Sequence, residues 1–112
     1  MTPDEFRTIA LSMPESDERS HMSHPDFRVN GKIFATLGPD LSWGMVKLTP
    51  EQQQYFLQNE PASFKAASGS WGERGATIID LKYSNEEAVR QAIRSAWRNI
   101  APNNLTLTRI GS

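Results

Sequence analysis

Asn30 and Gly31 join two short runs that are rich in apolar residues. Asn-Gly between such runs is the strongest short-range signal for a two-residue β-hairpin, because both turn positions require a positive φ that these residues tolerate. We therefore expect strands over residues 25–30 and 32–37 that pair antiparallel. This hairpin places the start of a β-sheet near the N-terminus and constrains how the rest of the chain can pack.

Regular pairing after this turn would give the hairpin one apolar face and one mixed face. The apolar face, which we expect under the helices, carries Phe27, Val29 and Phe34. Arg28 lies on the mixed face, either as a side chain whose stem covers Ile33 or as part of a binding surface. We expect this face to be open to water or partly covered by a loop, and it carries Asp26, Arg28, Ile33, Ala35 and Leu37.

Three segments begin with a helix-capping pattern. Two of them, TPDE at residues 2–5 and TPEQ at residues 49–52, combine a capping threonine with proline in the first turn. The third, SNEE at residues 84–87, is followed by apolar residues at helical spacing. We expect these helices to end before Pro14, near Asn59 and before Pro102.

Two further strands are predicted at residues 43–48 and 76–81. The resulting order is one helix, three strands, a helix, a strand and a last helix. This order predicts a single α+β domain over residues 1–112, with helices packed on one face of a four-stranded antiparallel sheet. Residues 103–112 alternate in polarity, and they form either a fifth strand at a sheet edge or a tail.

Composition supports a globular protein and limits its chemistry. Of 112 residues, 38% are hydrophobic and 22% are charged, and the absence of cysteine excludes disulfides and thiolate metal sites. The net charge of −1, from 12 basic and 13 acidic side chains, restricts any nucleic-acid role to a local basic patch. The acidic N-terminus is unlike a signal peptide, and no apolar run approaches the roughly 20 residues of a membrane helix. We expect a soluble, cytoplasmic protein.

No pattern of catalytic residues is present in the sequence. No serine lies in a nucleophile-elbow motif, and the acidic residues cluster at helix starts, where capping explains them. His21 and His24 have the spacing of a metal-binding pair on a helix, but Pro25 directs the chain toward extended geometry. We therefore expect no enzyme activity, no metal site and no cofactor.

Residues 69–75, GSWGERG, form a glycine-rich loop that lacks the sequence of a phosphate-binding loop. One interpretation is a turn whose glycines adopt positive φ, with Trp71 packed down over it. The other is an exposed pair, Trp71 and Arg74, that can stack on a base or hold an anion. In the last helix, Arg90, Arg94 and Arg98 form a row that we interpret as a solvated face rather than a track for phosphates.

These stretches together resemble the MmcQ/YjbR family over about residues 6–97. The resemblance is carried by HPDFRVNGKIFATLG, VKLTPEQ, PASF and GSWGERGATIIDL, followed by the final helix. It implies a CyaY-like α+β fold, also called a double-wing domain, and a DNA-binding role based on fold analogy, with no catalytic residues or cofactor. The chain departs from the family pattern at Ala76, where many relatives have an aromatic residue, and its C-terminal end is poor in lysine. The pattern falls on His24, Pro25, Phe27, Arg28, Gly31, Lys32, Phe34, Trp71, Gly72 and Gly75.

The sequence thus predicts a non-enzymatic binding domain that uses its open sheet face and the loop at residues 69–75. DNA is the first expected partner, and a protein partner or small ligand is the alternative that the net charge favours. No membrane interaction is expected, and a monomer is favoured. A continuous positive patch across the sheet face would support DNA binding, whereas a mixture of positive and negative charges would not. The candidate contact residues are His24, Arg28, Lys32, Lys47, Trp71 and Arg74.

Overall fold

The computed structural model describes residues 1–21 and 24–102. The alternatives for residues 103–112 therefore lie outside the described residues, as does the side chain of His21. The described chain contains α1 (Pro3–Leu11), β1 (Ser16–His21), β2 (His24–Val29), β3 (Lys32–Leu37), β4 (Trp43–Lys47), α2 (Pro50–Asn59), β5 (Phe64–Ala66), α3 (Gly69–Glu73), β6 (Ala76–Asp80), a 3₁₀ turn (Leu81–Tyr83) and α4 (Glu86–Ile100).

The strands form one six-stranded antiparallel sheet in the order β1-β2-β3-β4-β6-β5. The α+β class predicted from the sequence is confirmed, but the expected count of four strands is wrong. The two strands that were missed are those at the sheet edges. β1 reads SDERSH, which has no apolar alternation, and β5 has only three residues, so neither carries the usual strand signal.

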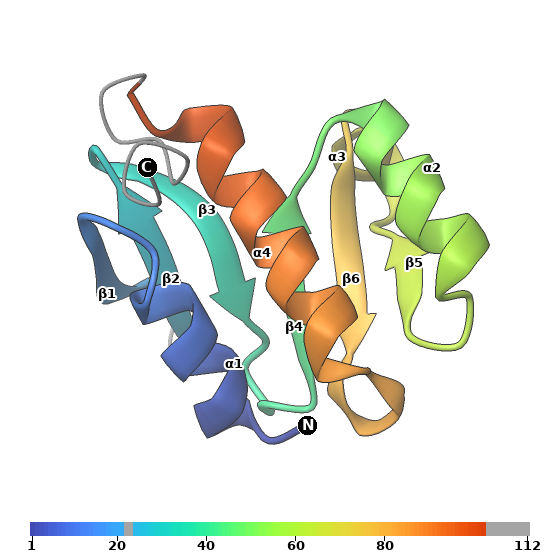
Figure 1. The fold of residues 1–112 in the computed structure, drawn as a ribbon, viewed down its shortest axis with the longest axis horizontal. Coiled ribbons are helices and arrows are strands. Elements are labelled where there is room, and N and C mark those ends of the chain that lie inside the picture. Colours follow the sequence, from blue (N-terminus) through green and yellow to red (C-terminus); the bar gives the residue numbers. More distant parts are fainter. Residues whose placement is uncertain (22–23, 103–112) are drawn as a thin grey trace.

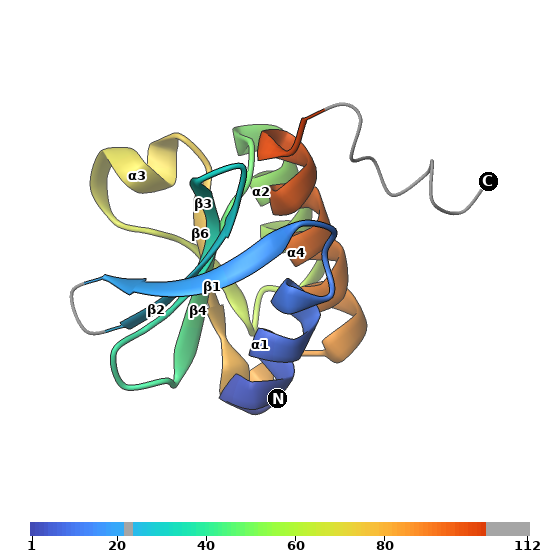
Figure 2. The ribbon, with the colours of Figure 1, turned by 90° about the vertical axis from the view of Figure 1, so that its left-hand side faces the viewer.

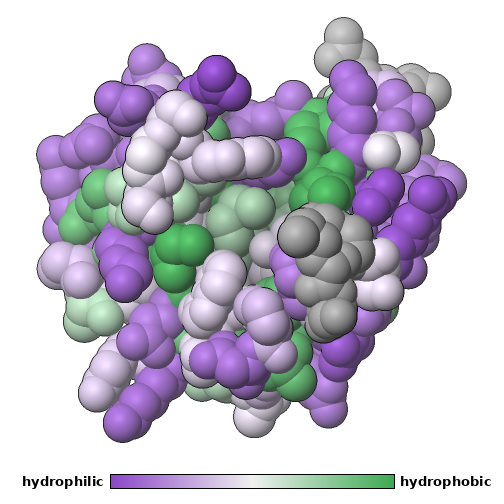
Figure 3. Space-filling model, turned by 180° about the vertical axis from the view of Figure 1, so that it is seen from behind, coloured by the Kyte–Doolittle hydropathy of each residue, from purple (hydrophilic) through white to green (hydrophobic). Residues whose placement is uncertain are grey.

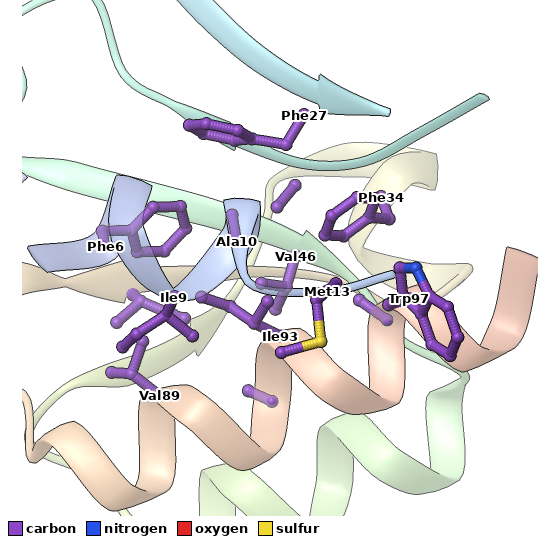
Figure 4. Packing of buried hydrophobic residues seen from close by; sticks show 14 of the residues in the cluster. Phe6, Ile9, Ala10, Met13, Phe27, Phe34, Val46, Val89, Ile93 and Trp97 are labelled. Carbon is purple, nitrogen blue, oxygen red and sulfur yellow. The ribbon is translucent and has the colours of Figure 1, made fainter. Parts of the chain in front are cut away.

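Three helices, α1, α2 and α4, cover one face of the sheet (Figure 1). The short helix α3 lies on the opposite side, as the view along the sheet shows (Figure 2). The core fills the space between the sheet and the three-helix layer, where Phe27 and Phe34 face Trp97 and Ile93 of α4 (Figure 4). Trp97 is fully buried, and its Nε1 donates a hydrogen bond of 2.9 Å to the carbonyl oxygen of Pro14.

A β-bulge in the opening hairpin changes which residues face the core. Val29 pairs with Lys32 and Arg28 with Ile33, as predicted, but Phe27 pairs with Ala35 instead of Phe34. The register shift between Phe27 and Arg28 inserts one residue in β3. As a result Ala35 and Leu37, predicted on the open face, are fully buried in the core, and Thr36 faces the other side.

Both threonine capping patterns form as predicted. The hydroxyl of Thr2 accepts from the N–H of Glu5, and a carboxylate oxygen of Glu5 accepts from the N–H of Thr2. Thr49 and Gln52 make the same reciprocal pair at the start of α2. The hydrogen bonds from Thr2 lower the pKa of Glu5 below 4.5. Within residues 1–21 and 24–102, no helix is long and apolar enough to cross a membrane.

Candidate binding surface on the uncovered sheet face

The sheet face opposite the three-helix layer, here called the uncovered face, carries a shallow apolar pocket. Seen from behind, this face shows hydrophobic side chains near its middle with hydrophilic side chains around them (Figure 3). The pocket has a volume of about 260 Å³ and is here called the sheet-face pocket. Its lining residues are His24, Ile33, Thr36, Trp43, Met45, Lys47, Ala67, Trp71, Ala76 and Ile78.

Trp71 forms an exposed aromatic wall of this pocket. Its side chain comes from α3, and 60% of the residue is exposed to solvent. The interpretation in which Trp71 packs down as a lid is therefore wrong, although Gly69 and Gly75 do adopt the positive φ that it required. An indole that remains exposed can stack against a flat ligand or cover an apolar one.

The backbone that carries Trp71 is tightly held. A Cβ at Gly72 would lie 1.8 Å from the carbonyl oxygen of Ala67, and one at Gly75 would lie 1.9 Å from that of Leu48. Only glycine fits such close backbone contacts. The buried side chain of Gln53 in α2 adds a hydrogen bond of 3.0 Å from Nε2 to the carbonyl oxygen of Gly72. The aromatic wall therefore stands on a rigid support.

Lys47 brings a positive charge to the pocket beside the indole. Its Nζ lies 5.4 Å from the centroid of the Trp71 ring, a cation–π contact of about 0.5–1 kcal/mol at an exposed site. In the part of the chain that the structure describes, no carboxylate lies within 4.0 Å of this ammonium group. The charge of Lys47 is therefore available to an acidic group of a ligand.

His24 lies at the start of β2 and lines the same pocket. Its Nδ1 is 3.1 Å from the carbonyl oxygen of Leu37. Because a carbonyl oxygen only accepts hydrogen bonds, this contact places a proton on Nδ1 and fixes the orientation of the ring. No group of three or more acidic or histidine side chains among the described residues is arranged to hold a metal ion.

The arginine that was predicted to contact a partner is engaged within the protein. Arg28 Nε and Nη2 donate hydrogen bonds of 2.8 and 3.1 Å to the two carboxylate oxygens of Asp26, which is fully buried. These bonds raise the pKa of Arg28. On β1, Arg19 and Asp17 form a second ion pair of 2.9 Å, and Asp17 lies opposite Arg28. The β1–β2 corner of the uncovered face is therefore a mixture of charges.

The remaining two predicted contact residues lie apart from the pocket lining. Lys32 pairs with Val29, whose side chain is in the core, so the exposed Lys32 belongs to the helix side of the hairpin end. Arg74 is exposed directly after α3. Of the six predicted residues, the structure thus brings His24, Lys47 and Trp71 together and leaves Arg28, Lys32 and Arg74 outside the pocket.

The apolar floor of the pocket was missed by sequence reasoning. Trp43, Met45 and Lys47 alternate along β4 toward the uncovered face, and Ala76 and Ile78 do so along β6. A strict period of two in both strands was the available signal. It was hidden because apolar residues on the core face turn each strand into a nearly continuous apolar run.

A second, larger cavity adjoins the pocket at the sheet edge. It has a volume of about 600 Å³ and lies along β5 and the residues on either side of it. Trp43, Ala67 and Ile78 line both cavities, so these three side chains form the shared boundary. The exposed Lys65 of β5 lies opposite Ile78 and lines only this edge cavity.

Comparisons with known proteins give a family and a fold. The family model described as YjbR matches residues 11–99. No curated protein matches the chain. Among solved structures, the protein DR2400 of Deinococcus radiodurans, described as a DUF419 domain, matches with a TM-score of 0.75 at 18% identity, over 96% of this chain and 83% of that chain. At this identity the structural match supports the fold alone.

Proposed function

The chain belongs to the YjbR family, and we propose that this member is a non-catalytic binding domain whose ligand occupies the sheet-face pocket. One observation carries the proposal: an exposed indole, an ammonium group outside any described ion pair and an apolar floor meet in one concave site. Apolar pockets with a few convergent polar groups are the usual form of ligand sites in proteins.

The chemistry of the lining supports binding rather than catalysis. Among the described lining residues there is no carboxylate and no serine, and the only hydroxyl among them is that of the buried Thr36. Recognition of a ligand needs only the shape, the ring and the charge that this site provides.

An uncharged fluorescent dye tests whether this pocket is the binding surface. N-phenyl-1-naphthylamine is expected to gain fluorescence on binding the wild-type protein, and Trp71→Ala should remove most of the gain. Tyr55→Ala is the matched control, because Tyr55 is also aromatic and 54% exposed but lies on α2 in the opposite layer. Equal fluorescence gains in the wild type and both variants would overturn the proposal.

Single-stranded nucleic acid is a second candidate, favoured by the exposed Trp71 beside Lys47. Stacking of bases on an aromatic side chain next to cations is the usual way in which single strands are bound. The mixed charges of the β1–β2 corner give less support for a phosphate track across the whole face. A fluorescence-polarisation titration with labelled single- and double-stranded oligonucleotides at low salt decides this point. Flat titration curves, or binding that salt does not weaken, would exclude nucleic acid as the ligand of the pocket.

A further inference from the structure

We infer that the ligand of the sheet-face pocket is an aromatic anion, a flat ring system that carries an acidic group. The inference rests on the proposed function and adds the chemical class of the ligand. It follows from three features of the site: the apolar floor, the exposed indole and the charge balance around Lys47.

The floor and the wall of the pocket fit a flat apolar group. Ile33, Met45 and Ile78 contribute aliphatic surface, and Trp71 stands beside them with its ring exposed. Aromatic groups favour offset or edge contacts with an indole. An apolar cavity of about 150 Å³ is known to hold benzene, so the 260 Å³ of this pocket suits one or two fused rings.

The charge balance of the uncovered face favours a negative ligand. Arg28 and Arg19 are each paired with a carboxylate of this face, whereas the ammonium group of Lys47 contacts only the indole among the interactions of the described residues. Hydrogen bonds between an ammonium and a carboxylate or phosphate are stronger than neutral ones. A ligand acid would therefore draw Lys47 into an ion pair, while a neutral ring would leave the ammonium without one.

The distance between the Lys47 ammonium and the Trp71 ring limits where the acidic group is attached on the ligand. Lys47 Nζ lies over the Trp71 ring, 5.4 Å from its centroid, so a ligand ring that packs on this face of the indole would displace the ammonium to the edge of that ligand ring. The acidic group is therefore attached to the ring directly or through a short linker. The hydrogen bond from Gln53 and the close contact at Gly72 hold the backbone that carries Trp71 before binding, which lowers the entropic cost of ordering this segment.

Two sources of ligand share this chemistry: small aromatic carboxylates and nucleotides. A matched pair of probes isolates the charge, because indole-3-acetate and indole-3-acetamide differ in charge but have nearly the same shape. By isothermal titration calorimetry at low salt, the acid should bind the wild-type protein about tenfold more tightly than the amide. Thymidine monophosphate forms the second arm, and tighter binding of the nucleotide than of the acid would identify a nucleotide source.

Variants of two lysines connect this preference to the pocket. Lys47→Met should abolish the preference for the acid, and Lys47→Gln repeats the test if the methionine variant does not fold. Lys65→Met is the matched control, because Lys65 is an exposed lysine of the same sheet face outside the sheet-face pocket. It should keep the preference.

Equal binding of acid and amide, a preference that persists in Lys47→Met, or binding of neither probe and no nucleotide would overturn the inference. The proposed function is judged separately by the uncharged dye and its dependence on Trp71.

Discussion

Gln53 on α2 donates a hydrogen bond of 3.0 Å from Nε2 to the carbonyl oxygen of Gly72 on α3, although the two helices lie on opposite sides of the sheet (Figure 2). The same Nε2 also donates hydrogen bonds of 3.0 Å to the carbonyl oxygen of Ala76 and 3.2 Å to the hydroxyl oxygen of Thr77. One buried amide therefore connects the helical layer to the segment that presents Trp71.

Replacing Gln53 with leucine should destabilise the protein and loosen this segment. The change removes the Gln53 hydrogen bonds to Gly72, Ala76 and Thr77, although the carbonyl oxygens of Gly72 and Ala76 each keep a backbone donor, and we expect it to cost about 1–3 kcal/mol in the free energy of unfolding. Urea denaturation measures this loss. Gln54→Leu, at the exposed neighbouring position, should change stability by less than about 0.5 kcal/mol. Equal urea midpoints for the two variants would contradict the role given to Gln53.

Gly72→Ala tests the close approach of α3 to the backbone before it. A Cβ at this position would lie 1.8 Å from the carbonyl oxygen of Ala67, and backbone atoms cannot move away without shifting the loop. We expect a loss of at least about 1–3 kcal/mol in thermal or urea unfolding. Ser70→Ala, an exposed position in the same helix, serves as the control. A stability of Gly72→Ala equal to that of the control would show that the loop relaxes freely.

The bulge in β3 predicts different losses of stability for substitutions at two residues that regular pairing would place on the same face of the sheet. Ala35 is fully buried, whereas Ile33 lines the sheet-face pocket and is only half-buried. Ala35→Asn adds volume and an amide to the core, at an expected cost of about 2–4 kcal/mol. Ile33→Asn should cost about 1 kcal/mol, since less apolar area leaves water there. Similar costs in chemical denaturation would favour regular pairing without a bulge.

The two capping boxes should respond differently to acid. The lowered pKa of Glu5 means that its stabilising effect on α1 is complete above about pH 4.5 and is lost as the pH falls through the folded-state pKa. The box of α2 uses Gln52, which does not titrate. Amide hydrogen exchange and NMR shifts between about pH 5 and 3 should show fraying of α1 but not of α2.

Glu5→Gln is the matched control for this titration, because it keeps the acceptor and removes the charge. It should make the first turn of α1 less sensitive to pH than in the wild type. A measured pKa of 4.5 or higher for Glu5, or equal fraying of both helices, would argue against the assigned cause.

Local signals were enough to predict most of the fold. The Asn30-Gly31 turn, the capping boxes and the helical spacing along α4 depend on neighbours in sequence, and the structure confirms all three. The bulge in β3 was not predicted, because the Asn30-Gly31 turn fixes the pairing next to it but not a register shift further along the hairpin. β1 was missed because a polar edge strand is stabilised by its pairing with β2 rather than by burial of its own side chains.

The candidate site was predicted less completely, for a similar reason. Trp71 and His24 were singled out by their local sequence and Lys47 as a cation of the expected binding surface, and the three line one pocket. Asp26 and Arg28 were both placed on the mixed face of the hairpin, but their pairing with each other was not predicted. The apolar floor comes from three strands, so it becomes visible only when their order in the sheet is known.

The most direct test of the account is the position of a bound ring on the protein surface. Titration of ¹⁵N-labelled protein with indole-3-acetate, followed by NMR, should shift the Trp71 indole N–H and the amides of β3, β4, β6 and α3. The amides of α2 and α4 should change little. The largest shifts on the other layer, around the groove lined by Tyr55 and Arg94, or no shifts at millimolar ligand, would contradict the claim that the uncovered sheet face is the binding surface.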